Sequence, residues 1–317
     1  MKEIGGYIEL DRYKGEEYHL RALALNCGRA CLAYLIRQRE IKKIYLPRFL
    51  CSSVAETCRS EDISYEYYPI DEKFRPLING VPGSGEWLYI VNYYGQIKDE
   101  ELRQYRQRFQ RIIVDHTQAF FHPVIEGIDT IYTCRKFFGV ADGAYLYTQA
   151  KPMAMKQDFS YERMRFLMGR FEKNANQFYG EYAANENQLF ADGEVRAMSK
   201  LTHNMLRAVD YKDIAERRTE NFSYLHEKLG KKNGLRLEIP YGAFMYPFYT
   251  EDGLEIRREL QKKKIYIPTL WPNVLSECGK GELECKYAEN ILPLPVDQRY
   301  TLEDMSYMVE ELYGCIN

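Results

Sequence analysis

The feature that most constrains this chain is a pair of short strand-like runs, each followed by a charged residue. The first run, Ile112-Ile113-Val114, ends at Asp115, and the second, residues 129–133, stops just before Lys136. Short apolar runs are typical of strands buried on both faces of a parallel sheet. The carboxyl ends of such strands meet at one edge, where ligands collect, so we expect Asp115 and Lys136 to face a common site.

Strand-like and helical patterns alternate through the first part of the chain. Alternation of this kind predicts the α/β class, with a mostly parallel sheet sandwiched by helices. Asn92, like Asp115, then falls at a strand end. We expect helices to begin at Gly28 and to span 52–60 and 99–109, and strands to span 41–46, 64–69, 87–93, 111–115, 129–133 and 145–147.

The second part of the chain has a different pattern. Residues 151–195 are polar, aromatic and poorly periodic, and a long amphipathic helical pattern follows over 198–229. We predict a large domain over 1–196, with residues 1–20 as an N-terminal arm, and a smaller α+β domain over 197–317. Within the smaller domain we expect strands over 235–239, 244–249 and 265–267 and helices over 255–263 and 301–313.

Charge and composition exclude several classes of protein. A formal net charge of −2 gives no electrostatic reason to expect nucleic acid or an anionic membrane as partner. No apolar run is long enough to span a bilayer, and residues 1–6 lack the apolar stretch of a signal peptide. The eight cysteines form no Cys-x-x-Cys pair, which favours reduced thiols in the cytoplasm and predicts no metal site.

Asp115 and Lys136 together indicate a cofactor. A carboxylate at a buried strand end is costly unless a cation or hydrogen-bond donors face it, and the protonated ring nitrogen of pyridoxal 5'-phosphate is such a cation. A lysine beside Phe137 and Phe138 loses hydration, which lowers its pKa and suits it to carry this cofactor as a Schiff base. Taken alone, Asp115 is better explained as a helix-capping or turn residue, and Lys136 as one of the many lysines that are solvated surface charges. The spacing between Asp115 and Lys136 favours the cofactor instead.

The phosphate of such a cofactor needs donors, and the helix expected from Gly28 offers them. Unpaired backbone N–H groups and the positive end of the helix dipole attract anions, and a glycine permits close approach. The guanidinium of Arg29 and the hydroxyl of Thr133 are further candidate donors. Arg135 is either structural or a second charge near the phosphate.

The ring of the cofactor needs neighbours of another kind. Gln118 could donate to its phenolic oxygen, although a solvent-bonded or backbone-bonded amide is nearly as good an interpretation. Phe49 and Tyr93 are candidates to stack on the ring, and each taken singly is better explained as a core residue. His116 is better explained as a satisfied structural histidine.

These motifs resemble the DegT/DnrJ/EryC1/StrS family, the sugar aminotransferases of the aspartate-aminotransferase superfamily, fold type I. The resemblance spans most of the chain, and the lysine and aspartate motifs are its specific part. It is carried by Asn26-Cys27-Gly28-Arg29-Ala30, Val91-Asn92-Tyr93-Tyr94-Gly95, Val114-Asp115-His116-Thr117-Gln118-Ala119, Lys136 with Asp142-Gly143, and Ile291-Leu292-Pro293-Leu294-Pro295.

The resemblance implies a fold, an activity and an assembly. The sheet is expected to be of the seven-stranded type, and the enzyme to move an amino group from glutamate or a similar donor to a keto sugar carried on a nucleotide. A homodimer with the active site at the subunit interface is implied as well. The implied roles are Schiff-base lysine for Lys136, partner of the ring nitrogen for Asp115, contact to the phenolic oxygen for Gln118, and phosphate contacts for Cys27, Gly28 and Arg29.

The chain also departs from that family. Cys27 and Arg29 replace a serine and a threonine of the phosphate turn, and Asn92 replaces a histidine. The family's segment that reaches the partner's cofactor is not recognisable around 193–196. We therefore predict an aminotransferase of sugar biosynthesis, and two alternatives stay open. One is a lyase or dehydratase on the same cofactor, against which Lys136 argues, and the other is a degenerate homologue kept as a binding or regulatory subunit.

Overall fold

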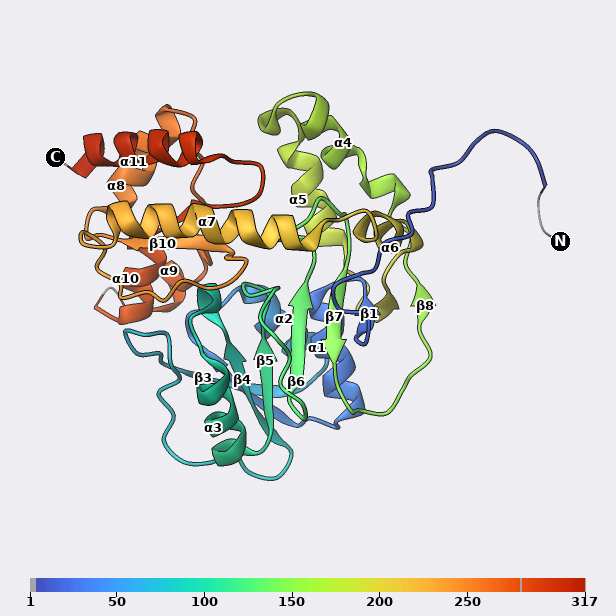
Figure 1. Ribbon diagram of the computed structural model, residues 1–317. Helices are drawn as coiled ribbons and strands as arrows, with labels where there is room; N and C mark the ends of the chain where they lie inside the picture. Colours follow the sequence, from blue (N-terminus) through green and yellow to red (C-terminus); the bar gives the residue numbers. More distant parts are fainter. Residues whose placement is uncertain (1–3, 280, 317) are drawn as a thin grey trace.

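A nine-stranded sheet forms the centre of the molecule (Figure 1). The computed structural model describes residues 4–279 and 281–316. The strand order is β3-β2-β4-β5-β6-β7-β1-β9-β8. The bounds of the strands are β1 Leu23–Leu25, β2 Lys43–Pro47, β3 Ser64–Tyr68, β4 Glu86–Val91, β5 Ile112–Asp115, β6 Asp129–Thr133, β7 Ala144–Tyr147, β8 Lys156–Gln157 and β9 Arg196–Ala197.

The predicted, mostly parallel sheet is confirmed. Strands β3, β2, β4, β5 and β6 pair in parallel, whereas β7 runs antiparallel to both β6 and β1. All four residues of β5 are buried, as expected for a strand whose two faces are covered. The reversal at β7 follows from the short connection after β6, because antiparallel neighbours need no crossover helix.

Helices cover both faces of this sheet, with α1 and α2 behind it and α3 in front in Figure 1. Helix α1 begins at Gly28, where the sequence predicts it, and its middle is buried from Ala30 to Ile36. The helices of the first two thirds of the chain are α1 Gly28–Gln38, α2 Ser52–Ser60, α3 Asp99–Phe109, α4 Arg165–Glu172 and α5 Tyr179–Gln188, and short 3-10 turns lie at η1 Tyr93–Gly95, η2 Tyr161–Arg163 and η3 Ala175–Phe178.

A second, two-stranded sheet lies in the last third of the chain. Strands β10 Met245–Tyr249 and β11 Ile291–Pro295 pair antiparallel, and helices α7 Tyr211–Leu229, α8 Gly253–Lys262 and α11 Leu302–Ile316 accompany them. Strand β9 lies across the predicted boundary between residues 196 and 197, and the two-domain division stays a prediction. These elements share a separate apolar core that includes Phe222, Leu225, Tyr246, Phe248, Leu260, Leu292 and Leu312.

The single long helix predicted over 198–229 is wrong, because the structure has two. Helix α6 Lys200–Leu206 ends first, and the side chain of Asp210 then caps α7 by accepting the N–H of Asp213 at 3.1 Å. An aspartate that caps a new helix interrupts the old one. The helices α4 and α5 were not predicted, since short and largely exposed helices carry little periodic signal.

The strands predicted over 235–239 and 265–267 are also wrong, because neither range has a strand partner in the part of the chain that the structure describes. Each is followed by a proline, Pro240 or Pro268, which cannot donate to a ladder. The backbone at Glu238 bonds instead to the side chain of Gln96, at 2.8 Å. Helices α9 Val274–Glu277 and α10 Leu283–Asn290 complete the fold. Among the helices of residues 4–279 and 281–316, none is both long and apolar enough to cross a bilayer.

Leucine truncations should measure how strongly the fold depends on the central sheet. Leu88 in β4 is fully buried, whereas Leu77 is 51% exposed. We expect Leu88→Ala to lower the free energy of unfolding by about 2–5 kcal/mol, because it leaves a cavity. The matched control Leu77→Ala should change it by less than about 0.5 kcal/mol. Urea denaturation followed by circular dichroism gives both values, and equal losses would contradict the buried position of β4.

Candidate active site

Asp115 is a buried carboxylate at the end of β5. It is 5% exposed. Its Oδ2 accepts the hydroxyl of Tyr89 at 2.8 Å, and its Oδ1 accepts the backbone N–H of Thr117 at 2.7 Å. Within residues 4–279 and 281–316, no arginine, lysine or histidine forms an ion pair with it. Each oxygen keeps a further lone pair, so the site can receive a cationic N–H donor.

Lys136 follows β6 in a tight turn. Its Nζ donates to Oγ1 of Thr117 at 3.1 Å and lies 5.6 Å from the centre of the Phe244 ring. Desolvation by the surrounding protein lowers the pKa of the amine from 10.5, the nearby Asp115 opposes this effect, and Arg135 adds to it. Water reaches the side chain, which is exposed, yet the protein around it is dense enough to penalise the ammonium form.

Thr117 joins the two charged residues, and sequence reasoning missed it. Its N–H bonds to Asp115 and its hydroxyl accepts from Lys136, so one half-buried residue connects the carboxylate to the amine. The signal was available. An aspartate often bonds the N–H two residues on, which turns the chain and brings the following side chains back over the strand end.

The start of α1 lies beside this cluster. A Cβ on Gly28 would sit 3.9 Å from side-chain atoms of both Thr117 and Ile131. The N-cap residue, Cys27, is buried and extended and makes no side-chain cap bond, and the first turn carries no acidic residue. The first N–H groups of α1 are therefore available to an anion, as the sequence predicts.

Helix α5 covers the same region from another part of the chain. The guanidinium of Arg29 donates to the backbone carbonyl of Glu186, and Arg135 forms an ion pair with the carboxylate of Glu186. Burial lowers the pKa of Arg135, and the neighbouring Arg29 adds to this effect. Arg29 thus points at α5 in this structure. Thr133 is 4% exposed, and its hydroxyl makes only a 3.5 Å contact with the carbonyl of Gly143.

Three predicted cofactor residues are held by neighbouring protein groups, and one of them, Asn92, donates its backbone N–H to the carbonyl of Asp115 at 2.9 Å. Asn92 is fully buried, and its side chain bonds both the N–H and the carbonyl of Ile97, which shapes the turn after β4. The hydroxyl of Tyr93 donates to the carbonyl of Phe49, and their rings lie 5.5 Å apart. Phe49 also packs edge-on against Trp271 at 4.5 Å. The structure thus gives Asn92 and Tyr93 hydrogen bonds to the backbone, and gives the Phe49 ring contacts with other aromatic rings.

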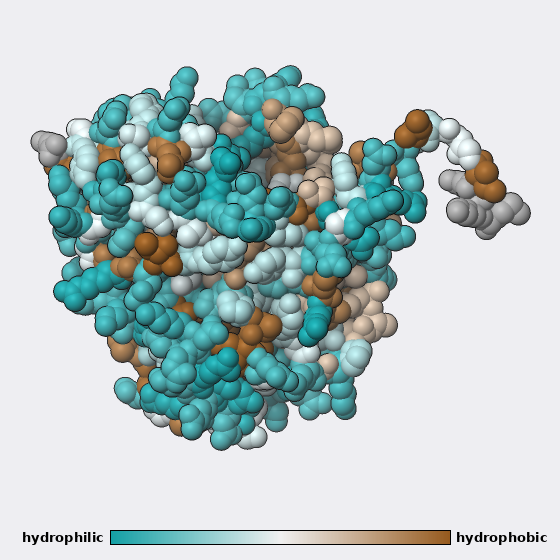
Figure 2. All heavy atoms as spheres, viewed as in Figure 1, coloured by the Kyte–Doolittle hydropathy of each residue, from teal (hydrophilic) through white to brown (hydrophobic). Residues whose placement is uncertain are grey.

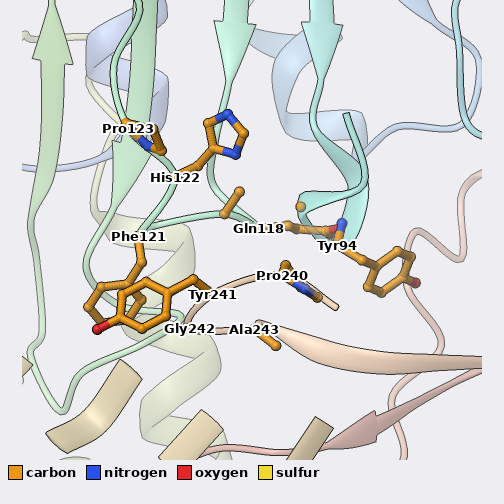
Figure 3. A pocket seen from close by; sticks show the side chains of 11 residues that line it. Tyr94, Gln118, Phe121, His122, Pro123, Pro240, Tyr241, Gly242 and Ala243 are labelled. Carbon is orange, nitrogen blue, oxygen red and sulfur yellow. The ribbon is translucent and has the colours of Figure 1, made fainter. Parts of the chain in front are cut away.

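Gln118 lies at the edge of a hollow between the segment after β5 and the segment before β10 (Figure 3). Its Oε1 accepts the N–H of Tyr94 at 3.0 Å. Figure 3 shows Phe121 and Tyr241 close together at one end of the hollow and His122 on its opposite side, next to Pro123. Neither Lys136 nor Asp115 lines this hollow, so it adjoins the charged cluster and is distinct from it.

The contacts of the histidines near the strand ends are with other protein groups, but the prediction that His116 is fully satisfied is wrong, because its buried Nδ1 has no hydrogen-bond partner among the described residues. His122 bonds Asp99 at 2.8 Å, and the ring of His116 lies 4.5 Å from that of His122. Burial lowers the pKa of His116 well below 6.5, and His122 adds to the effect. In the described part of the chain, no group of three or more His, Cys, Asp or Glu side chains is placed to hold a metal ion.

The fold of this chain is similar to that of several solved structures. No protein-family model matches the sequence, and no curated protein is similar to it in sequence. Solved structures do match. Sugar aminotransferase CalS13 from Micromonospora echinospora superposes with a TM-score of 0.61 at 13% identity, covering 93% of this chain and 87% of CalS13.

Two further structures agree with this result. A DegT DnrJ EryC1 StrS aminotransferase from Brucella abortus gives a TM-score of 0.61 at 13% identity, covering 92% of this chain and 85% of its own. The putative sugar aminotransferase Spr1654 from Streptococcus pneumoniae, in its PLP-form, superposes with a TM-score of 0.58 at 14% identity. The match covers 92% of this chain and 86% of Spr1654. The predicted resemblance is thereby confirmed at the level of the fold.

The lowered pKa of Lys136 predicts a pH-dependent reactivity. Between that lowered value and 10.5 the folded protein holds the neutral amine, whereas the unfolded chain holds the ammonium. Competitive acetylation followed by peptide mass spectrometry should therefore modify Lys136 at lower pH than exposed Lys231, and urea should abolish the difference. Coincident profiles in the folded protein would contradict the desolvated setting of the amine.

Proposed function

We propose that this chain is a pyridoxal-phosphate-dependent aminotransferase that moves an amino group from an amino-acid donor, glutamate, to a keto sugar. The observation that carries the proposal is the joined pair at the strand ends. Asp115 is a buried carboxylate with no ion-pair partner among the described residues, Lys136 is an amine of lowered pKa, and Thr117 bonds to both. A flat cationic ring between carboxylate and amine would satisfy both groups.

The residues of the site fit this cofactor. Asp115 would hold the ring nitrogen protonated, Lys136 would bind the aldehyde carbon, and the free N–H groups at Gly28 and Arg29 would receive the phosphate at the start of α1. Gln118 would reach the phenolic oxygen, since its amide nitrogen is not used by the bond to Tyr94. When bound, the cofactor supplies an electron sink for a carbanion at the substrate Cα.

The chain's own groups would supply the proton chemistry. Because the pKa of Lys136 is lowered, a larger share of its amine is neutral near neutral pH, so it can accept a proton from the substrate Cα. Thr117 accepts a hydrogen bond from that amine and so limits its direction. The Phe244 ring closes one side of the amine against bulk water.

The known structures support the reaction class. CalS13 is a sugar aminotransferase, and Spr1654 has been obtained in PLP and PMP forms, the two forms between which an aminotransferase cycles. A nucleotide on the sugar acceptor is part of the proposal by the same resemblance. The described part of the chain contains eight free cysteines, which fits our proposal of a cytoplasmic protein.

Reductive trapping tests the proposed chemistry. Pyridoxal phosphate added to the protein should give a borohydride-stable adduct on Lys136, located by peptide mass spectrometry, and Lys136→Ala should abolish it, whereas the control Lys231→Ala should not. Asp115→Asn should still form the adduct but convert glutamate about 10²–10³-fold more slowly, because the amide cannot stabilise the charged ring nitrogen. Formation of pyridoxamine phosphate from glutamate distinguishes transfer from elimination.

Two results would overturn the proposal. An adduct spread over surface lysines would remove Lys136 from the reaction. Full glutamate turnover by Asp115→Asn would remove the carboxylate from it.

We further propose that the protein is a homodimer. Residues 4–10 of the arm extend away from the body of the molecule and include apolar side chains, some seen as brown spheres in Figure 2, that contact little of their own chain. Ile4, Tyr7 and Ile8 are 94%, 98% and 93% exposed. From Asp11 onward the arm is tied down, with Asn204 bonding the backbone of Asp11 and Tyr13. Exposed apolar residues of this kind fit burial against a second copy.

Sedimentation velocity tests the assembly. The full chain should sediment as a dimer, and the double variant Tyr7→Ser with Ile8→Ser should weaken the dimer, because it removes apolar area from the contact. Matched replacement of the exposed Leu302, which lies at the other end of the chain, should leave the dimer unchanged. A monomeric wild-type chain at micromolar concentration would rule the homodimer out.

A further inference from the structure

Arg218 is a guanidinium held in the protein interior without a carboxylate in ion-pair contact among the described residues. It lies in α7 and is 2% exposed. Burial lowers its pKa to about 10, and the more distant Asp297 opposes the effect. A buried charge of this kind is a poor source of stability, since an apolar side chain of similar volume packs at lower cost. The role of Arg218 is therefore inferred from the groups to which its guanidinium donates hydrogen bonds.

Those bonds converge on segments that meet at the candidate active site. Nη2 of Arg218 donates to the carbonyl of Phe137 at 3.2 Å, and Nη1 donates to the carbonyls of Ala243 and Phe244 at 3.0 and 3.4 Å. The guanidinium also lies 4.7 Å from the centre of the Phe137 ring. One side chain thus ties α7 to the turn that carries Lys136 and to the residues just before β10.

Gln298 completes the arrangement from the loop after β11. Its Oε1 accepts Nε of Arg218 at 2.9 Å, and its Nε2 donates to the same Phe137 carbonyl at 2.8 Å. The carbonyl of Phe137, one residue beyond Lys136, therefore receives two donors, one from Arg218 and one from Gln298. Holding the peptide group between Phe137 and Phe138 fixes the backbone one residue beyond Lys136, and so supports the turn from which the lysine side chain projects.

The same contacts place the aromatic neighbour of the amine. Phe244, whose carbonyl Arg218 bonds, puts its ring 5.6 Å from Nζ of Lys136. Both the backbone beside the amine and the ring that faces it are thus held by one guanidinium. Arg218 bonds neither Lys136 nor Asp115 through its side chain, so its effect on Lys136 is indirect.

We propose that Arg218 and Gln298 are positioning residues that hold the turn after Lys136 and the segment of Phe244, and so aim the amine of Lys136. The proposal rests on the proposed role of Lys136 as the cofactor-binding lysine. Small displacements of a reacting group carry large penalties in rate, of the order of 10²-fold for about 1 Å. Loss of either residue should therefore slow attack by Lys136 on an aldehyde without removing any group that touches it.

The test uses two variants and one control. Arg218→Lys keeps a charge but cannot bond all three segments, and Gln298→Leu removes the second donor to Phe137 while leaving the helix intact. Arg217→Lys, the neighbouring half-buried position on α7, makes none of these bonds and serves as the matched control. Thermal melts followed by circular dichroism confirm that each protein is folded, and Gln298→Leu carries the test if Arg218→Lys does not fold.

Two readouts separate this proposal from the proposed function. In cofactor-free protein, competitive acetylation against pH should show the pKa of Lys136 rising toward its ordinary value in both variants, because the amine gains solvent. With pyridoxal phosphate, borohydride trapping on Lys136 should slow by about tenfold or more in both. Folded variants with a wild-type acetylation profile and wild-type trapping would overturn the proposal. Failure to trap wild-type Lys136 would overturn the proposed function, while the acetylation profiles would still decide whether Arg218 positions the amine.

Discussion

The structure depends on one constraint: a carboxylate, Asp115, stands at the covered end of a central strand. Such a group is tolerated only if donors surround it, and the fold supplies the hydroxyl of Tyr89 from the adjacent strand and the N–H of Thr117 from its own turn. The turn that satisfies the carboxylate also places the Thr117 hydroxyl against Lys136. The hydrogen bond that the buried carboxylate of Asp115 needs thus also places Thr117 where it can contact Lys136.

The other end of the site is built from segments that lie far apart in sequence. The start of α1 offers free N–H groups beside Thr117, and α5 covers this region through Glu186, which contacts both Arg29 and Arg135. In the resembling family, a loop of the partner subunit is expected near this place. Here a helix of the same chain lies over the two arginines. The arginine at the start of α1 is engaged by this helix through its bond to the carbonyl of Glu186.

Much of the fold could be predicted from the sequence, because buried parallel strands and amphipathic helices carry strong periodic signals. The strands around Asp115 and the start of α1 are examples. The helices α4 and α5 escaped prediction because they are short and half-exposed, and the break at Asp210 escaped because a cap inside a periodic pattern looks like a polar helix position. Strands predicted before Pro240 and Pro268 failed because strand propensity alone supplies no partner.

That Asp115 and Lys136 lie close together could be predicted, because both follow the ends of neighbouring strands. Contacts between side chains and groups far apart in the sequence could not be predicted. The spacing of Asp115 and Thr117 signals the bond between them, but nothing local signals that the Thr117 hydroxyl also accepts from Lys136. In the same way, nothing near Arg218 shows that it bonds the carbonyl of Phe137. Arg29 shows the opposite case, since its guanidinium turns to α5 although its position suggested the phosphate. Roles for Phe49, Tyr93 and Asn92 at the cofactor remain proposals, because their present contacts are to neighbouring protein groups.

A crystal structure of the protein grown with pyridoxal phosphate tests the central claim most directly. The account predicts continuous density from Nζ of Lys136 to the cofactor and a ring nitrogen at about 2.7–2.9 Å from the carboxylate of Asp115, the distance of a charge-assisted hydrogen bond. A structure in which the cofactor lies elsewhere, with Asp115 bonded only to Tyr89 and Thr117 and with Lys136 unmodified, would contradict it.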